Sequence, residues 1–201
     1  MGAAADGGLR VVMLGAPGSG KGTQAERLAA AYGIPAISTG EMLRAAVAAG
    51  SDLGRKVQAV MAQGKLVDDE LMADVIRERL AQADAGRGFL LDGYPRTGAQ
   101  ARTLEEVLRS SGAELAHVLY LEVPEEVLVE RALGRGRADD SEPVVRERLR
   151  VYRDSTEPLV QHYRERGLLR TVRGDQSMDE VASDLRRVLG VPGSLPAEAG
   201  S

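Results

Sequence analysis

The sequence contains no cysteine and no asparagine, and it has no long apolar run. Without cysteine it cannot form a disulfide, a thiolate metal site or a cysteine nucleophile, which agrees with a reducing compartment. Without asparagine it cannot carry the NKxD motif by which GTPase switches recognise guanine. A membrane helix needs about 18 consecutive apolar residues, and residues 1–8 lack the charged start and apolar stretch of a signal peptide. We therefore expect a cytoplasmic protein with no membrane partner.

Neither sign of charge is in large excess, since the formal net charge is −4 over 201 residues. The many arginines therefore do not amount to a basic surface for nucleic acid, and we expect no nucleic-acid partner. The length fits one sizeable domain, and 43% hydrophobic residues suffice for a core. Nothing in the sequence demands more than a monomer. The ends, 1–8 and 190–201, are rich in small residues and are expected to be disordered.

Short apolar runs alternate with stretches of helical periodicity along the chain. The runs predicted as strands are 9–14, 36–37, 88–91, 117–123 and 168–172. Strands separated by helices predict an α/β fold in which a parallel sheet is covered on both faces. Ligands of such folds bind beyond the carboxyl ends of the strands. We therefore expect the functional residues to follow the strands.

Two regions break this alternation. Residues 38–67 hold two helical stretches and no strand, which predicts a small helical insertion beside the sheet. Residues 134–142 are polar and contain glycine, which predicts an exposed loop. Both are candidates for moving parts. After the loop, a long helix is expected from Asp140 or Ser141 to about Arg166.

The first expected strand runs directly into the segment GAPGSGKGT, residues 15–23. Its glycines let successive backbone N–H groups converge on phosphate oxygens, and Lys21 adds a positive charge. A helix expected from about Gly20 to Tyr32 presents its positive end to the same anion. The general phosphate-loop pattern has a magnesium-binding hydroxyl directly after the lysine, whereas here Gly22 holds that place and Thr23 follows. The segment predicts a nucleotide-phosphate site without direct magnesium ligation from the loop.

A second motif, FLLDGYPRT, spans residues 89–97. Asp92 follows a buried strand near the glycine loop, where a carboxylate suits magnesium held through water, because magnesium loses its water reluctantly. A helix cap or turn is the alternative explanation of this aspartate. Arg96 is expected to project into the same cleft. Gly93 allows close backbone approach, and the Tyr94–Pro95 peptide bond is a candidate for the cis form.

The segment Ser38 to Glu41 has the pattern of a capping box, with Ser38 as N-cap and Glu41 returning a hydrogen bond. Arg44 lies one turn into that helix, near its positive end, where a bound phosphate would add to both attractions. His117 and His162 have no metal partner nearby in the sequence, and we interpret both as structural.

Arginines are dense between residues 131 and 150. For Arg146 and Arg150 we favour a solvated helix face with salt bridges to neighbouring glutamates. For Arg135, Arg137 and Arg148 we favour phosphate contact, because phosphoryl transfer spreads charge over oxygens that fixed cations stabilise. One well-placed arginine can contribute roughly 10³ to 10⁵ in rate. Asp139 and Asp140 are expected to hold the loop by hydrogen bonds.

Several separated motifs occur in one order along the chain: GAPGSGKGT, STGEMLR (38–44), GKLVDDEL (64–71), FLLDGYPRT with Gln100, and GRADD leading to VRERL (136–149). Over about residues 11–189 the chain closely resembles the adenylate kinases. The resemblance implies one P-loop kinase domain, 1–189, with a five-stranded parallel core and a disordered tail, 190–201. It also implies an AMP-binding insertion, 38–67, and a short lid, 134–140, without the longer zinc-type insertion of some members. No structural zinc is therefore expected.

The resemblance implies two sets of binding residues, and Mg²⁺ would accompany ATP. The ATP set is Gly18, Ser19, Gly20, Lys21, Gly22, Thr23, Arg135 and Gly174. The AMP set is Thr39, Arg44, Lys65, Leu66, Val67, Gly93, Tyr94, Pro95, Arg96, Gln100, Arg137 and Arg148. The residues expected to carry the chemistry are Lys21, Asp92, Arg96, Arg137 and Arg148.

The reaction implied is reversible transfer of the γ-phosphoryl group of Mg·ATP to AMP, giving two ADP. A UMP/CMP-type kinase is the nearest alternative, because it shares the loop and the arginines. Such kinases tend to carry alanine where this chain has Thr39, which favours AMP. A GTPase-type switch would need the absent NKxD motif. An inactive nucleotide binder is disfavoured because Lys21, Asp92 and the phosphate arginines are intact.

Overall fold

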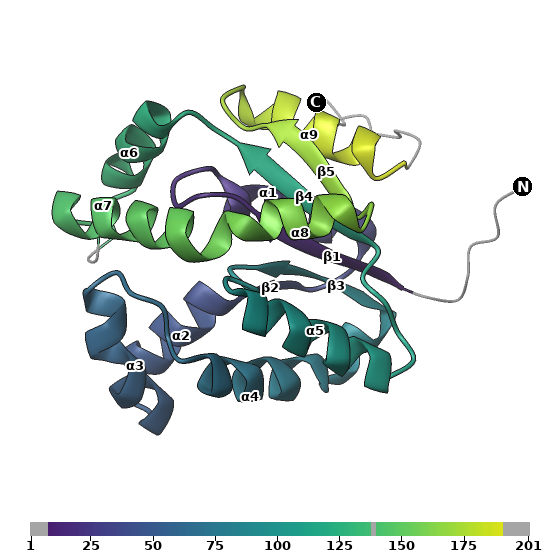
Figure 1. Cartoon of the computed structure of the whole chain (residues 1–201), viewed down its shortest axis with the longest axis horizontal. Helices are drawn as coiled ribbons and strands as arrows, with labels where there is room; N and C mark the ends of the chain where they lie inside the picture. Colours follow the sequence, from purple (N-terminus) through teal and green to yellow (C-terminus); the bar gives the residue numbers. More distant parts are fainter. Residues whose placement is uncertain (1–7, 138–139, 191–201) are drawn as a thin grey trace, which may run out of the picture.

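The computed structural model describes residues 8–137 and 140–190, and it confirms the predicted α/β fold. The sheet has five strands, namely β1 (Leu9–Leu14), β2 (Ala36–Ser38), β3 (Gly88–Asp92), β4 (His117–Glu122) and β5 (Leu169–Arg173). All neighbouring strands are parallel and the order is β2-β3-β1-β4-β5 (Figure 1). Every predicted strand lies within one residue of its observed bounds. The expectations for residues 1–7, for 191–201 and for Asp139 fall outside the described ranges.

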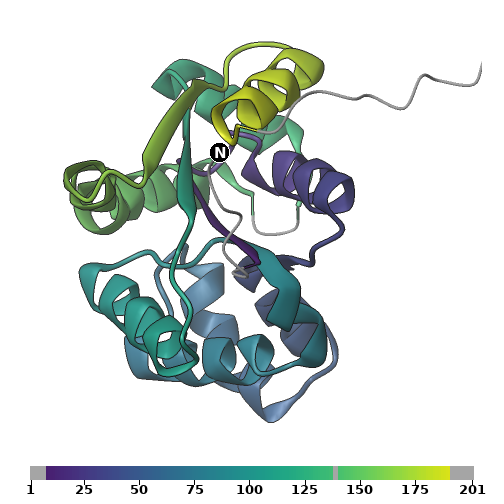
Figure 2. The ribbon, with the colours of Figure 1, turned by 90° about the vertical axis from the view of Figure 1, so that its right-hand side faces the viewer.

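Helices cover both faces of the sheet, as predicted. The described elements are α1 (Lys21–Tyr32), α2 (Thr39–Ala48), α3 (Asp52–Ala62), α4 (Asp69–Leu80), a 3₁₀ turn (Ala83–Arg87), α5 (Gly98–Ser110), α6 (Glu125–Gly134), α7 (Glu142–Val151), a π-helical turn (Tyr152–Thr156), α8 (Pro158–Glu165) and α9 (Met178–Val188). With the sheet seen nearly edge-on, α1 and α9 lie on one side and α5 and α8 on the other (Figure 2). No helix in the described part of the chain has the length and apolar character to span a membrane.

The alternation of side chains along β1 explains why the sheet is buried on both faces. Val11 and Met13 pack in the core beneath α1 and α9. Val12 and Leu14 pack in the larger core beneath α4, α5 and α8. A strand with both faces covered is apolar at successive positions, as at residues 11–14. The polar residues Ser38 and Asp92 stand at the carboxyl ends of β2 and β3.

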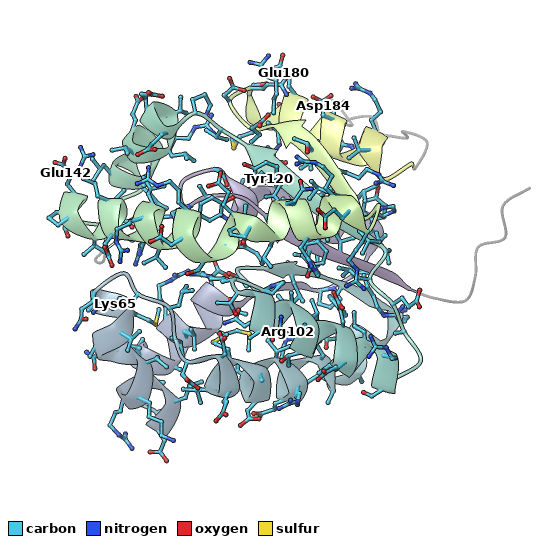
Figure 3. All side chains as sticks on the ribbon, in the orientation of Figure 1. Lys65, Arg102, Tyr120, Glu142, Glu180 and Asp184 are labelled. Atoms are coloured by element: carbon cyan, nitrogen blue, oxygen red, sulfur yellow. The ribbon has the colours of Figure 1, made fainter. Side chains whose placement is uncertain are left out.

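The predicted helical insertion corresponds to α2 and α3, which have no strand between them. The turn after α3 reaches across to α7, since a Cβ placed on Gly64 would lie 3.1 Å from the carbonyl oxygen of Val144 and 3.2 Å from Cγ of Arg148. Figure 3 labels Lys65 beside this turn and Glu142 at the start of α7, both at the same end of the molecule. The insertion and α7 thus enclose the space beyond the sheet from two sides.

The long helix predicted up to about Arg166 is present from Glu142 to Glu165, but a π-helical turn divides it, which the sequence did not predict. The chain turns through α7, then a π-helical turn, then α8, and Glu157 N–H bonds to the Tyr152 carbonyl five residues back. Pro158 supplies the physical reason, because proline has no N–H to donate and its ring clashes with the carbonyl four residues back. A wider turn accommodates the proline without ending the helix.

The predicted capping box at Ser38 and Glu41 is also wrong. Ser38 occupies the N-cap of α2, but its side chain makes no cap hydrogen bond. Its hydroxyl instead donates over 3.5 Å to Asp92, which lies beside it in the β2–β3 register. A capping box does occur at the start of α9, between Ser177 and Glu180. The neighbouring carboxylate in the sheet therefore overrides the local sequence signal.

Candidate active site

The glycine loop after β1 has backbone angles that suit glycine. Gly18 and Gly20 have φ angles of 89° and 91°, in a region where a side chain is strained. A Cβ on Gly18 would also lie only 2.4 Å from the carbonyl oxygen of Leu128. The loop closes through a bond from Ser19 N–H to the Ala16 carbonyl, 3.1 Å. It then leads into the N-terminus of α1, as the sequence predicts.

Lys21 lies at this helix start and folds back over the loop. Its Nζ donates to the Ala16 carbonyl at 2.9 Å. Removal from bulk water lowers the pKa of Lys21 to about 8; Asp92 opposes this, and the charges of Arg96, Arg135 and Arg137 add to the lowering. A cation surrounded by other cations favours an anionic partner. Lys21 therefore marks an anion site.

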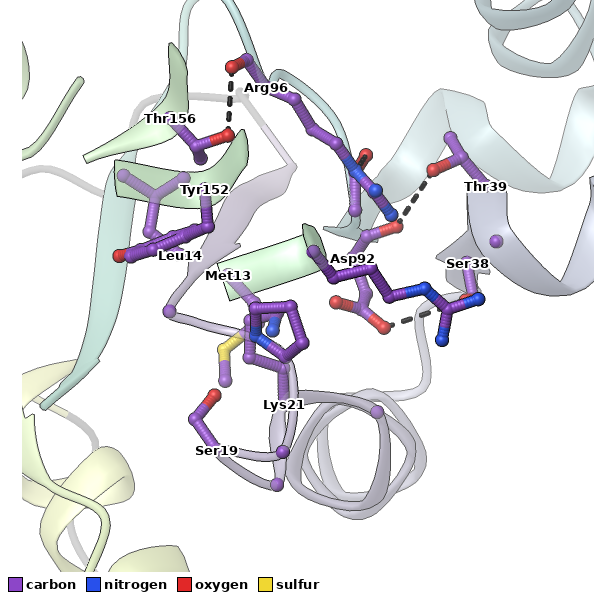
Figure 4. A pocket seen from close by; sticks show the side chains of 18 of the residues that line it. Met13, Leu14, Ser19, Lys21, Ser38, Thr39, Asp92, Arg96, Tyr152 and Thr156 are labelled. Carbon is purple, nitrogen blue, oxygen red and sulfur yellow. Dashed lines mark hydrogen bonds between the residues drawn. The ribbon is translucent and has the colours of Figure 1, made fainter. Parts of the chain in front are cut away.

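Asp92 ends β3 and lies between β1 and β2 in the sheet, paired with Met13 and Ser38. Its Oδ2 accepts the Ser38 hydroxyl, and its backbone carbonyl accepts the Thr39 hydroxyl at 3.4 Å (Figure 4). Among the described residues, its buried Oδ1 has no hydrogen-bond partner. A buried carboxylate oxygen without a partner is costly unless a ligand meets it.

Arg96 is held at three points. Its backbone N–H donates to Oε1 of Gln100 at 2.8 Å, and its Nε donates to the Gly93 carbonyl at 2.7 Å. Its own carbonyl accepts the Thr156 hydroxyl from the π-helical turn at 2.9 Å (Figure 4). Burial lowers the pKa of Arg96, Asp92 raises it, and the charges of Arg148 and Arg44 lower it further. The guanidinium is thus fixed in a crowded positive field.

The loop between α6 and α7 is held by Asp140, as predicted. The carboxylate accepts two hydrogen bonds from Arg135, at 2.8 and 2.7 Å, and one from Arg148 at 2.9 Å. Its side chain is 1% exposed. Burial raises the pKa of Asp140, but the Arg135 hydrogen bond and the charges of Arg135, Arg148 and Arg137 outweigh this, so the pKa is lowered.

These groups surround one cavity of about 480 Å³ at the carboxyl edge of the sheet. Only Glu41 and Asp92 contribute carboxylates to its described lining. Eight cationic side chains face them: Lys21, Arg44, Lys65, Arg96, Arg131, Arg135, Arg137 and Arg148. Such an excess of fixed positive charge fits a polyanion with several phosphates.

The family is decided by comparison with known proteins. A sequence model of the family described as adenylate kinase matches residues 13–168. The chain belongs to the adenylate kinase family. It is 52% identical over 186 residues to an adenylate kinase of Xanthomonas euvesicatoria pv. vesicatoria (strain 85-10), covering 90% of this chain and 100% of the relative. It is 51% identical over 177 residues to an adenylate kinase of Stenotrophomonas maltophilia (strain R551-3), covering 86% of this chain and 95% of that relative.

The structure brings nearly all of the residues predicted from the adenylate kinase resemblance to this cavity. The predicted residues that line it are Gly18, Ser19, Gly20, Lys21, Gly22, Thr23, Thr39, Arg44, Lys65, Leu66, Val67, Asp92, Gly93, Pro95, Arg96, Gln100, Arg135, Arg137, Arg148 and Gly174. Tyr94 is the exception, since it is buried in the core with 1% of its surface exposed. The Tyr94–Pro95 bond is cis, as anticipated. Arg146 and Arg150 pair with Glu142 and Glu147, outside the cavity, as predicted.

The sequence analysis missed other cavity residues of this adenylate kinase family member. Ser38, which the capping pattern identifies only as an N-cap, is the last residue of β2, as Asp92 is the last residue of β3. Arg131 lines the cavity and donates to the Gly174 carbonyl at 2.7 Å. Its spacing of four from Arg135 was the available signal. Gln176 and Met178, which also line the cavity, follow the end of β5.

Adenylate kinases use magnesium with ATP, and the chemistry around Asp92 fits that ion. The unpartnered Oδ1 is a hard oxygen donor, and a Cβ on Gly22 would lie 3.6 Å from Oδ2, so loop and carboxylate are adjacent. Within the described ranges there is no group of three or more His, Cys, Asp or Glu placed to hold a metal. The expectation that structural zinc is absent stays a prediction.

Proposed function

We propose that this chain catalyses the reversible transfer of the γ-phosphoryl group of Mg·ATP to AMP, giving two ADP. One observation carries the proposal: the glycine loop, the Asp92 carboxylate and the phosphate arginines line a single cavity at the strand ends. The membership of the adenylate kinase family supports the choice of substrates. ATP, AMP and ADP are therefore the small-molecule partners.

The donor phosphates are assigned to the glycine loop. Backbone N–H groups of Gly18 to Thr23 and the positive end of α1 bind phosphate oxygens. Lys21 adds a charge that can follow the transferred group, and Arg135 contacts the donor side. Gly174 borders the adenine of ATP, where a Cβ would lie 2.6 Å from Cγ2 of Val123.

The acceptor AMP is assigned to the insertion side of the cavity. Its phosphate binds Arg44, Arg96, Arg137 and Arg148. Its nucleoside contacts Thr39, Gln100, Gly93, Pro95 and the backbone of Lys65, Leu66 and Val67. Arg96 is positioned in advance, since its Nε donates to the Gly93 carbonyl and two hydrogen bonds hold its backbone before substrate binds. Such preorganisation lowers the barrier because no charge has to be reoriented during transfer.

Asp92 is assigned to the magnesium site, holding the ion through water. When bound with ATP, magnesium neutralises donor phosphate charge and orients the oxygens. The protein's part is to supply Oδ1 of Asp92, while the Ser38 hydroxyl donates to Oδ2 and the Thr39 hydroxyl donates to the Asp92 backbone carbonyl.

Transfer needs no general base, because the acceptor is already a phosphate anion. An AMP oxygen attacks in line, and Lys21 and the arginines stabilise the charge that spreads over the transferred oxygens. Water is the competing acceptor, so the insertion (38–67) and the short lid (134–140) must close before transfer. We assign these two segments as the moving parts of the 1–189 domain.

A panel of acceptors tests the proposal. With ATP as donor, ADP formation is measured with AMP, UMP, CMP and GMP in a coupled assay. The proposal requires kcat/KM for AMP to exceed that for every other acceptor. A preference for UMP or CMP would contradict it. The cytoplasmic location and the monomeric state remain predictions, which cell fractionation and sedimentation test.

A further inference from the structure

Gln100 is a cavity residue whose amide is engaged at both ends by the protein. The residue is 2% exposed and lines the cavity. Its Oε1 accepts the Arg96 backbone N–H at 2.8 Å, and its Nε2 donates to Oδ1 of Asp69 at 2.8 Å. A primary amide has two N–H donors and an oxygen with two lone pairs. One donor and one acceptor therefore remain for a ligand.

The two protein partners fix which end of the amide points where. A backbone N–H can only donate and a carboxylate can only accept. Reversing the amide would place Nε2 against the Arg96 N–H and Oε1 against the charged Asp69 oxygen. Two like groups facing each other without water are strongly disfavoured.

Asp69 is itself held in place, and it lies outside the cavity lining. It is the first residue of α4, and the Thr97 hydroxyl lies 3.1 Å from its Oδ1 and 3.0 Å from its Oδ2. The same Thr97 oxygen accepts the Gln100 backbone N–H at 3.1 Å. The Asp69 carboxylate therefore contacts the side chain of Gln100 directly and its backbone N–H through the Thr97 hydroxyl.

The orientation of an amide distinguishes two classes of purine. A 6-amino purine offers a donor at N6 and an acceptor at N1, and a glutamine amide can pair with such a donor and acceptor together. A 6-oxo purine offers the reverse pattern, an acceptor at O6 and a donor at N1. In one base pose, a fixed amide pairs with one pattern and opposes the other, whereas an amide free to reverse can pair with both.

We infer that Asp69 is a positioning residue that makes the acceptor site selective for 6-amino purines by fixing the orientation of the Gln100 amide. The inference rests on the proposed function, in which AMP is the acceptor. It assigns specificity to a carboxylate that does not line the cavity. A site whose buried polar groups are left unpaired by the wrong base rejects that base strongly.

The test compares AMP with IMP, which differ only in exchanging the 6-amino for the 6-oxo pattern. In Asp69→Asn the new amide can donate as well as accept, so it no longer opposes a reversed Gln100. The ratio of kcat/KM for AMP to that for IMP is expected to fall about tenfold or more, with the KM for ATP unchanged. Asp69→Ala, which removes the acceptor without adding a donor, should move the ratio in the same direction.

Asp68→Asn is the matched control. Asp68 is the exposed N-cap of α4 and accepts the N–H groups of Glu70 and Leu71, a role that asparagine can fill. This variant loses the same charge one residue away and should keep the wild-type ratio. A merely structural role of Asp69 would change AMP and IMP turnover equally.

Two outcomes separate the inference from the proposed function. If the wild-type chain prefers AMP over IMP and folded Asp69→Asn or Asp69→Ala keeps that ratio, the inference is overturned and the proposed function stands. If the wild-type chain does not convert ATP and AMP to ADP, the proposed function fails and the inference fails with it. Thermal melting of each variant identifies which of them are folded.

Discussion

At the scale of single residues, the removal of the Arg96 side chain has the most specific expected effect. It is half-buried, its Nε donates to the Gly93 carbonyl, two further hydrogen bonds hold its backbone, and it is assigned to the acceptor phosphate. Replacing one arginine that stabilises transferred charge costs roughly 10³-fold or more in rate. Arg96→Ala should therefore lower kcat/KM for AMP by about that factor while ATP binding, measured by calorimetry, stays near the wild-type value.

Arg102→Ala is the control for this variant. Arg102 is an exposed arginine on α5, six positions along the chain, and it does not belong to the cavity lining. Its removal should leave both turnover and ATP affinity unchanged. Near-normal turnover in Arg96→Ala would remove Arg96 from the acceptor site.

Lys21 predicts a pH dependence of ATP binding. Its pKa is lowered to about 8 by removal from water and by neighbouring arginines, and bound phosphates should raise it again. Above pH 8 the free enzyme loses this proton, so binding must take one up, and affinity should weaken by up to about tenfold per pH unit. Calorimetry in two buffers of different ionisation enthalpy measures the uptake. Affinity that stays constant from pH 7 to 9.5 would contradict the assignment, and Lys21→Met should bind weakly without this pH dependence.

The sequence predicts which residues lie at the strand ends. It does not predict the roles of side chains whose partners are distant in the chain. Asp92 and the glycine loop were predicted because each follows an apolar run. Ser38 was misread because its hydroxyl bonds to Asp92, 54 residues away, and not to its own helix. Tyr94 lies within a predicted binding motif, but its side chain packs in the core. The direction of a side chain within a motif is set by packing, which spacing alone does not give.

At the scale of elements, the loop between α6 and α7 depends on Asp140. The carboxylate is almost fully buried and accepts from Arg135 and Arg148. Hydrogen bonds to charged groups contribute about 1.5–3 kcal/mol each. In Asp140→Asn one of the two oxygens becomes an NH₂ donor, so at least one of the three bonds is lost, and the free energy of unfolding at pH 7 should fall by about 1.5 kcal/mol or more. Denaturant unfolding measures the change. Asp154→Asn, which breaks an exposed ion pair with Arg150, should cost less than about 1 kcal/mol.

The lowered pKa of Asp140 sets the direction of its pH dependence. A carboxyl whose pKa is depressed in the folded state stabilises the fold above its unfolded-state pKa, and this contribution is lost as pH falls through the folded-state pKa. Wild-type stability should therefore fall below about pH 4 more steeply than that of Asp140→Asn. Parallel acid-unfolding curves for the two proteins would exclude the interaction.

Two serines at helix starts should respond differently to alanine. Ser177 accepts the Glu180 N–H and completes a capping box on α9, so Ser177→Ala should cost about 1 kcal/mol of stability. Ser38 makes no cap bond, so Ser38→Ala should cost less. Equal losses in chemical denaturation would contradict this distinction.

The positions of the strands and of the insertion could be predicted because each depends on a local pattern. Apolar runs bounded by turns located the strands within one residue. The π-helical turn could not be predicted in the same way, since the periodicity of 142–165 continues through it. Pro158 was the local signal, but a proline can end, bend or widen a helix, and packing around Thr156 and Arg96 selects the last.

At the scale of the whole molecule, the sheet edge, the insertion and α7 enclose one positive cavity. Gly64 lies against α7, so the insertion and α7 already approach each other. Eight cations and two carboxylates line the cavity. Asp140 pairs with two of these cations, Arg135 and Arg148, and bound phosphates would offset the remaining positive charge. Both substrates must therefore be present before transfer, because closure over them excludes water.

Transfer of the γ-phosphoryl group to AMP instead of water is the central claim, and ATP labelled at the γ-phosphate tests it directly. With ATP and AMP together, the label should appear in the β-phosphate of ADP, with two ADP formed for each ATP consumed. With ATP alone, release of labelled inorganic phosphate should be slower by several orders of magnitude. Rapid release of labelled phosphate without AMP, or no label in ADP when AMP is present, would contradict the account.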